Sequence, residues 1–234
     1  MSEPSAEIHH QHQDVSGGWL RASVFGAMDG LVSNLGLISG MAGGSASSST
    51  IALAGVAGLA AGAFSMAAGE YVSVRSQNEL AQREIDVERH EIVNRPEAEL
   101  AELAQTYVDR GVDPDLARQV AEQISSDTER AVQAHAMLEL GVDPGQLASP
   151  RVAAGSSFLS FCVGALVPLL PYLFRATTLL PALVLASIGL FGAGALVSRV
   201  TARTWWFSGL RQLGFGLAAA GLTYLVGRIV GISL

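Results

Sequence analysis

The residue whose place in the chain most needs a chemical explanation is Asp29. It is the only charged residue in an apolar run from about 22 to 42. A carboxylate in the middle of a membrane span costs about 2.5–3.5 kcal/mol on insertion scales. Gly30, Ser33 and Asn34 add further polar groups at the same depth. The pattern favours a cation or proton site on a transport path; the alternative is an aspartate that is only hydrogen-bonded inside a helix bundle.

Met66 and Glu70 form a second pair, in the apolar run from about 50 to 72. Residues four apart share one face of a helix. A soft thioether beside a carboxylate suits a borderline metal such as Fe²⁺ better than Mg²⁺ or Ca²⁺. Methionine in an apolar helix more often serves packing, so this pair indicates a metal path only in combination with Asp29.

Four glutamates form two further pairs, Glu88 with Glu91 and Glu99 with Glu102, each pair three residues apart. Asn-Arg-Pro at 94–96 separates the pairs, so they lie on different helices that can face each other. Four converging carboxylates repel one another unless a cation lies between them. Oxygen-rich sites of this kind hold divalent metals, and a solvated acidic face is the alternative.

His135 and Glu139 are four residues apart in the next predicted helix. Imidazole and carboxylate at this spacing form a common half-site for transition metals. Position 135 also lies close to the apolar face of that helix, so a buried structural histidine is an equal alternative.

Long apolar runs are the elements that must position these groups. Half of the 234 residues are hydrophobic and only 15% are charged, against roughly 25% charged in an ordinary soluble domain. Each of the runs meets the length of about 20 residues that a bilayer requires. They cover approximately 22–42, 50–72, 152–174, 177–198 and 210–230. We therefore expect an all-α membrane protein with five transmembrane helices.

The placement of arginine predicts the orientation, because cytoplasmic loops carry an excess of basic residues. Arg21 precedes the first run, several arginines lie between the second and third, and Arg199, Arg203 and Arg211 lie between the fourth and fifth. The N-terminus, the segment between the second and third runs and the 199–209 loop are therefore expected on the cytoplasmic side. The predicted location is the plasma membrane, crossed several times.

The segment between the second and third runs is an acidic insert. Between Glu70 and Asp143 lie 17 of the 21 acidic residues. No Gly or Pro interrupts 73–93, so the second span is expected to continue into the insert. Asn94 is the predicted N-cap of the next helix, with Glu97 completing a capping box, and a third helix is predicted over 114–140 with one apolar face formed by Leu116, Val120, Ile124, Val132 and Leu138.

Four regions follow from these patterns. Residues 1–19 form a tail with His9, His10 and His12, predicted to be disordered; 20–74 carry the first two spans; 75–148 form a three-helix cytoplasmic metal-binding domain; and 149–234 carry the last three spans. Glycines at 55, 58 and 62, and at 189 and 192, provide small-residue faces on which a second copy of the chain can pack.

Several of these segments together resemble the vacuolar iron transporter family. The resemblance covers nearly the whole chain, from about Leu20 to Gly231. Its most specific pieces are 24–34 (VFGAMDGLVSN) and 65–74 (SMAAGEYVSV), supported by 169–172 (LLPY) and 209–213 (GLRQL).

The resemblance implies a five-helix homodimer with a cytoplasmic three-helix metal-binding domain that exchanges cytosolic Fe²⁺ for protons. It implies that Asp29 and Met66 line the pathway, with Glu70 as a neighbour. The family's metal-binding domain carries four glutamates spaced three, eight and three apart, which Glu88, Glu91, Glu99 and Glu102 reproduce.

One departure from the family pattern concerns the third helix of the insert. There the family completes its site with two adjacent methionines and a glutamate three residues later. Glu139 matches the glutamate, but the methionine positions hold His135 and Ala136. The resemblance therefore implies a site in which imidazole replaces one thioether and the other is missing.

The leading hypothesis is a proton-coupled divalent-metal transporter that exports Fe²⁺, with Mn²⁺, Zn²⁺ and Co²⁺ as alternative ions. The expected partners are metal ions, protons, the bilayer and a second copy of the chain, but not nucleic acid. No enzymatic activity, catalytic residue or cofactor other than the ion is expected. The main alternative is a membrane-anchored metal-binding or storage protein without transport, in which Asp29 would have no use. A passive channel is a further alternative.

Overall fold

Helices account for all the regular structure in the residues that the computed structural model of the chain describes, 18–199 and 203–233. Five of them are long and apolar enough to cross a membrane, which confirms the predicted number of spans. They are α1 (Gly18–Gly43), α2 (Ser48–Asn94), α6 (Pro150–Leu173), α7 (Leu180–Val197) and α8 (Trp205–Ser233). The helix α1 begins at Gly18, within the last two residues of the predicted tail. His9, His10 and His12 lie outside the described residues.

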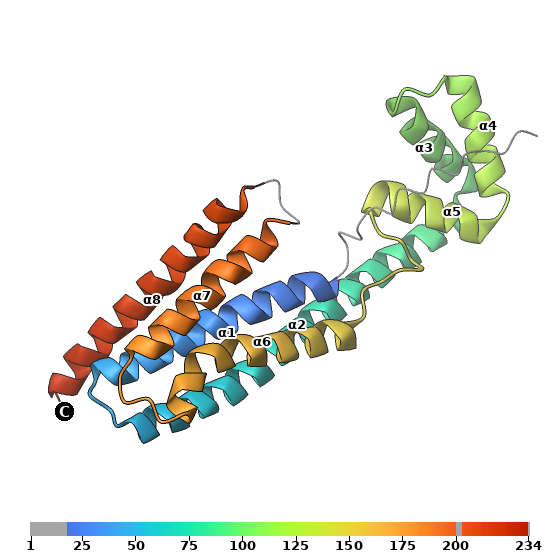
Figure 1. Cartoon of the computed structure of the whole chain (residues 1–234). Helices are drawn as coiled ribbons and strands as arrows, with labels where there is room; N and C mark the ends of the chain where they lie inside the picture. Colours follow the sequence, from blue (N-terminus) through green and yellow to red (C-terminus); the bar gives the residue numbers. More distant parts are fainter. Residues whose placement is uncertain (1–17, 200–202, 234) are drawn as a thin grey trace, which may run out of the picture.

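The first helix, α1, is the centre of the bundle and contacts α2, α6, α7 and α8 (Figure 1). Its apolar side buries Leu31 and Leu35 against Ala186 and Leu190 of α7 and Ala220 of α8. Because α1 contacts four helices, their packing fixes where Asp29 lies in the bundle.

The helices α1 and α6 approach each other closely. A Cβ added to Gly164 of α6 would overlap the carbonyl of Ala27, and one added to Gly30 would overlap the carbonyl of Phe161. The two backbones therefore pack directly on each other. Small residues allow this approach in lipid, where dispersion between close backbones drives association.

The glycines of α2 are used inside the chain. Cβ atoms at Gly55, Gly58 and Gly62 would meet the side chains of Leu169, Leu37 and Phe161, respectively. These glycines therefore pack on α1 and α6 within the chain, and packing of this face on a second copy stays a prediction. On α7, Gly189 faces Leu31 of α1, whereas a Cβ at Gly192 would meet nothing within 4 Å among the described residues.

The second helix, α2, continues without a break for 47 residues, about 70 Å at 1.5 Å per residue. Its first half lies in the bundle and its second half extends beyond it to the insert (Figure 1). This confirms the predicted continuation of the second span. One continuous helix therefore belongs to both the apolar bundle and the acidic insert.

The insert contains α3 (Pro96–Asp109), α4 (Pro114–Ser125), α5 (Thr128–His135) and a π-helical turn, η1 (Ala136–Leu140). The prediction of one helix over 114–140 is wrong. The chain breaks at Ser126 and Asp127 because the Asp127 side chain accepts the backbone N–H of Arg130 at 2.9 Å and caps a new helix. Such side-chain caps compete with helix continuation.

Two smaller predictions for the insert also fail. Asn94 belongs to α2, where its amide donates to the His90 carbonyl at 2.6 Å, and Arg95 occupies the N-cap of α3. The break at Asp127 also divides the predicted apolar face, so that Leu116 is exposed. The insert instead buries Ile85 and Ile92 of α2 against small residues of α5 and the π-turn, which are Ala131, Val132 and Ala136.

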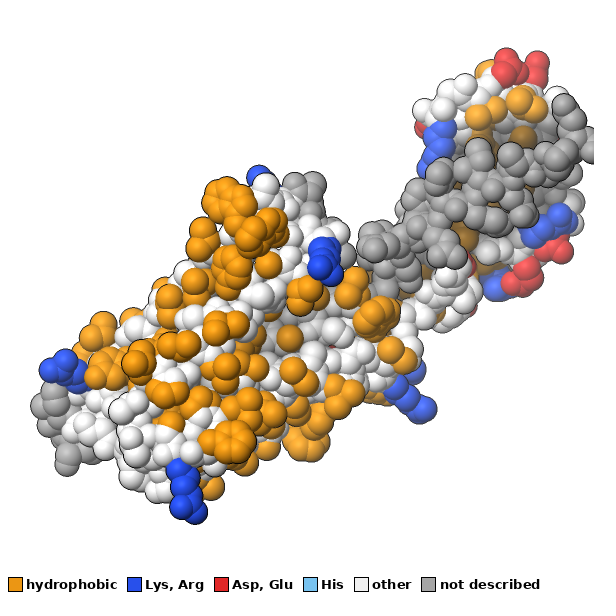
Figure 2. Space-filling view, in the orientation of Figure 1, with side chains coloured by type: hydrophobic (Ala, Val, Ile, Leu, Met, Phe, Trp, Pro, Cys, Tyr) orange, Lys and Arg blue, Asp and Glu red, His pale blue; other side chains and the backbone are white. Residues whose placement is uncertain are grey.

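The surface of the protein has an apolar part and an acidic part, as the sequence pattern predicts. Hydrophobic side chains spread over the visible face of the bundle, whereas the acidic side chains in this view lie on the insert (Figure 2). Arginines lie at the ends of the bundle, where long basic side chains reach the interface. This distribution matches a multi-pass membrane protein.

The α1–α6 contact yields the first prediction. Gly164→Ala should destabilise the bundle by about 1–3 kcal/mol, because the added methyl overpacks against the Ala27 carbonyl. Gly155→Ala on the same helix is the control, since a Cβ there meets nothing within 4 Å among the described residues. Thermal unfolding in detergent measures the difference, and equal melting temperatures for the two variants would contradict the packing.

Candidate functional site

A cavity of about 260 Å³ lies between α1, α2 and α6. Asp29 and Asn34 line it from α1, Met66 lines it from α2, and Phe161 lines it from α6. Gly58 and Gly62 leave space on the α2 side because they carry no side chain. The structure therefore brings Asp29 and Met66, predicted from separate spans, to one cavity.

Asp29 is exposed toward this cavity in the single chain. One of its carboxylate oxygens accepts a hydrogen bond from the Ser33 hydroxyl at 2.9 Å, one helical turn away. No salt bridge involves Asp29 among the residues that the structure describes. A carboxylate with one neutral donor keeps lone pairs for a cation or a proton.

Asn34 is a cavity residue that the sequence analysis noticed but did not include among the pathway residues. Its side chain is 2% exposed, and its amide donates to the Ala165 carbonyl of α6 at 2.7 Å. The amide oxygen is buried and has no hydrogen-bond partner among the described residues. A buried unpaired acceptor on a cavity wall is a natural ligand for a cation. Its spacing from Asp29 within one polar segment was the signal that could have identified it.

Glu70 does not line the cavity. It lies one turn beyond Met66 on α2, and its carboxylate accepts from the Arg21 guanidinium of α1 at 2.7 Å. The Glu70 side chain is only 16% exposed. Glu70 therefore lies along α2 between the cavity and the insert, and Arg21 neutralises it.

The insert brings a second set of predicted residues together around His135. Its Nδ1 atom lies 2.8 Å from an oxygen of Glu139, 2.9 Å from one of Glu88 and 3.9 Å from one of Glu99. His135 is 1% exposed. Ligand atoms of Glu88, His135 and Glu139, and those of Glu88, Glu91 and Glu99, lie within 4.8 Å of one another. Five predicted residues thus form one cluster of carboxylates around a buried imidazole.

The π-helical turn contributes to this arrangement. It begins directly after His135 and carries Glu139. The turn ends at Gly141, whose φ of 65° is a left-handed conformation that favours glycine. π-Turns occur frequently at functional sites, and this one was not predicted from the spacing of the two residues.

Glu102 belongs to neither group of converging ligand atoms. It lies close enough for its charge to act on the cluster, because it contributes to raising the pKa of Glu99, for which burial is the larger cause. The structure thus brings five of the six predicted insert residues together and leaves Glu102 at the periphery.

Burial raises the pKa of Glu88 to about 7. The adjacent His135 lowers the pKa of Glu88, and the neighbouring carboxylates, Glu139 first among them, raise it. Charged carboxylates gathered away from water are unfavourable unless a proton or a cation neutralises them. The cluster is therefore suited to exchange protons for a divalent ion near neutral pH.

The chain is similar to known proteins over most of its length. The family model described as the VIT family matches residues 20–228. The chain belongs to the VIT family. This confirms the resemblance seen in segments 24–34 and 65–74.

Curated relatives support the same assignment. The VIT-family chain is 41% identical to a vacuolar iron transporter of Acanthamoeba castellanii over 184 residues, which are 75% of this chain and 67% of the relative. It is 30% identical to vacuolar iron transporter 1 of Oryza sativa subsp. japonica over 232 residues, which are 97% of this chain and 92% of the relative. It is also 32% identical to vacuolar iron transporter 1 of Arabidopsis thaliana over 169 residues, 70% and 66% of the two chains.

The raised pKa of Glu88 yields a prediction about metal binding by this VIT-family chain. A metal ligand must be deprotonated, so a proton competes with metal as the pH falls through about 7. The Glu88 contribution alone should weaken Mn²⁺ binding about tenfold between pH 8 and pH 6, whereas a carboxylate of ordinary pKa would change it little. Competition with a metal-binding dye measures the affinity.

Glu88→Gln should bind more weakly at pH 8 and show a flatter pH dependence. Glu84→Gln is the control because Glu84 is an exposed carboxylate one turn earlier on α2. If Glu88→Gln and the wild type showed the same pH dependence, Glu88 would not be the group that exchanges its proton for metal.

Proposed function

We propose that this chain is a proton-coupled carrier that moves Fe²⁺, or Mn²⁺, Zn²⁺ and Co²⁺, out of the cytoplasm. The observation that carries the proposal is the one cavity that Asp29 and Met66 line from adjacent helices. The relatives' names, which designate them as vacuolar iron transporters, support iron as the main cargo.

The proposed sequence begins at the insert. Glu88, Glu91, Glu99, Glu139 and His135 capture the ion, which releases protons from the cluster. The ion then follows α2 toward the bundle, where Glu70 accepts it in exchange for Arg21. Met66, Asn34 and Asp29 bind the ion in the cavity. Protonation of Asp29 from the opposite side of the membrane then resets the carrier for the next ion. One carboxylate thus binds either the metal or the proton, which couples the two fluxes.

The proposed orientation places the N-terminus and the insert in the cytoplasm, because Arg21, the arginines of the insert, Arg199 and Arg203 lie at the same end of the bundle. The relatives are named for the vacuole. In a cell without vacuoles the corresponding site of export is the plasma membrane, which we propose for this chain.

A homodimer is part of the proposal. The α1 face that carries Asp29, Ser33 and Leu37 is exposed in the single chain. A second copy of the chain on this face would shield the carboxylate from lipid, which removes the cost of an isolated charge in the membrane.

The competing function is metal binding or storage without transport, which the acidic cluster alone would support. The two differ in what Asp29 does. A storage protein needs only the cluster of the insert, whereas a carrier needs the cavity as well. A passive channel would need the cavity but would not couple its flux to protons.

Replacement of Asp29 tests the carrier directly. Asp29→Asn keeps the shape but removes the charge, and should reduce Fe²⁺ transport into proteoliposomes at least about tenfold and abolish the accompanying internal pH change. Asp115→Asn is the control, since it removes an exposed carboxylate of α4. Unchanged transport in Asp29→Asn, or Fe²⁺ flux without proton movement, would contradict the proposed coupling.

His135 yields a prediction about selectivity. Imidazole favours Fe²⁺, Co²⁺ and Zn²⁺, whereas sites of carboxylates alone suit Mg²⁺ and Ca²⁺. His135→Asn should lower Co²⁺ affinity on the order of tenfold while leaving competition by Mg²⁺ unchanged or stronger. His90→Asn is the control, because His90 is an exposed histidine on the same segment of α2 as Glu88. Equal loss of Co²⁺ and Mg²⁺ binding would show that His135 only supports the fold.

A further inference from the structure

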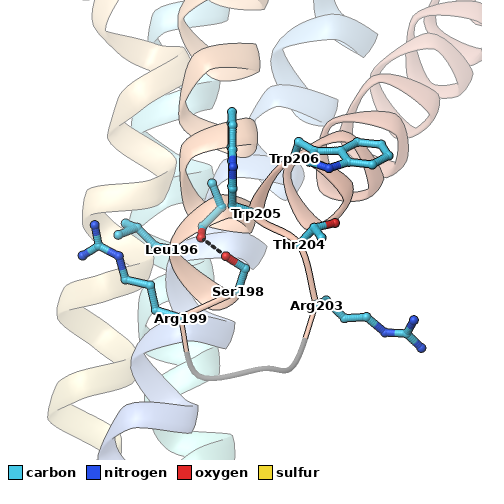
Figure 3. A pocket seen from close by; sticks show the side chains of 8 residues that line it. Leu196, Ser198, Arg199, Arg203, Thr204, Trp205 and Trp206 are labelled. Carbon is cyan, nitrogen blue, oxygen red and sulfur yellow. Dashed lines mark hydrogen bonds between the residues drawn. The ribbon is translucent and has the colours of Figure 1, made fainter.

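A wide pocket of about 700 Å³ lies where α7 ends and α8 begins. It is lined by Arg199 at the end of α7 and by Arg203, Trp205 and Trp206 at the start of α8. Figure 3 shows the two arginine side chains projecting from the two sides of the connection, with the tryptophan rings at the first turn of α8. Tryptophan and arginine together are typical of the level of the lipid headgroups.

The positive charge of this pocket has no counterpart in the second half of the chain. No Asp or Glu follows Asp143 in the sequence. Within the residues that the structure describes, neither Arg199 nor Arg203 forms a salt bridge. Two uncompensated guanidinium groups at the end of a membrane helix attract an anion from outside the chain.

A second cavity, about 250 Å³ in volume, lies beside the first, between α1 and α7. Its walls are almost entirely apolar and include Leu20, Val24 and Ala27 of α1 and Val197 of α7. Leu196 lines both cavities. A cationic pocket and an apolar groove therefore meet at one residue, which is the arrangement of charge and hydrocarbon in a lipid.

We propose that this pair of cavities binds an anionic phospholipid. Arg199 and Arg203, on the two sides of the connection, attract the anionic headgroup. One acyl chain occupies the groove between α1 and α7. A membrane lipid is the occupant rather than free phosphate, because a free anion has no use for the apolar groove.

The experiment uses the full-length protein, delipidated in detergent and titrated with dioleoyl-phosphatidylglycerol in native mass spectrometry. The double variant Arg199→Ala with Arg203→Ala should bind this lipid about 30-fold more weakly than the wild type, since each basic side chain near an anionic headgroup contributes a factor of about five. Arg151→Ala with Arg228→Ala is the matched control, because it removes the same charge from the start of α6 and the far end of α8. This control should bind the lipid like the wild type.

Two further titrations identify the ligand. Dioleoyl-phosphatidylcholine should bind more weakly than phosphatidylglycerol and equally to all three proteins, because it carries no net charge. Glycerol 3-phosphate should not displace bound phosphatidylglycerol. Equal phosphatidylglycerol binding by the two double variants would overturn the proposal, as would displacement by glycerol 3-phosphate or a lipid-free dimer whose second copy covers the groove.

Discussion

One unbroken helix governs the arrangement of the whole molecule. α2 runs from Ser48 to Asn94 and carries Met66 at the cavity, Glu70 one turn further on against Arg21, and Glu88 and Glu91 in the insert. No Gly or Pro follows Gly69 before Pro96, so the helix keeps its hydrogen bonds and its direction across the boundary between apolar and acidic surroundings. Its rigidity holds the acidic cluster and the cavity at a set separation and on defined faces of one element.

The second constraint is the cost of charge away from water. In the insert, burial raises the pKa of Glu88 to about 7, so the cluster binds either protons or a cation. In the bundle, Asp29 has only the Ser33 hydroxyl as a described partner, and the Asn34 amide oxygen beside it has none. The proposed carrier requires a cluster that a proton or a cation neutralises and a cavity whose oxygens can take a ligand.

Much of this could be predicted from the residues, because apolar runs of bilayer length and a charged residue within one of them are strong local signals. The continuation of α2 followed from the absence of helix breakers. The break at Asp127 could not be predicted in this way. An aspartate can cap a new helix or continue an existing one, and the two outcomes differ little in free energy. The role of Glu70 as a partner of Arg21 depends on how α1 packs against α2, and the pairing of Asn34 with the Ala165 carbonyl depends on the close approach of α1 and α6. Such contacts lie more than 40 residues apart in sequence and leave no local pattern.

In the proposed carrier, the cluster captures ions for the cavity, so that the two sites act in series along α2. The most direct test is the concentration dependence of Fe²⁺ transport in proteoliposomes that contain a variant in which Glu88, Glu91, Glu99 and Glu139 are all replaced by Gln. The account predicts a higher half-saturating Fe²⁺ concentration with a nearly unchanged maximal rate, because a saturating supply bypasses capture. An unchanged half-saturating concentration would contradict it, since the cluster would then play no part in delivering ions to the pathway.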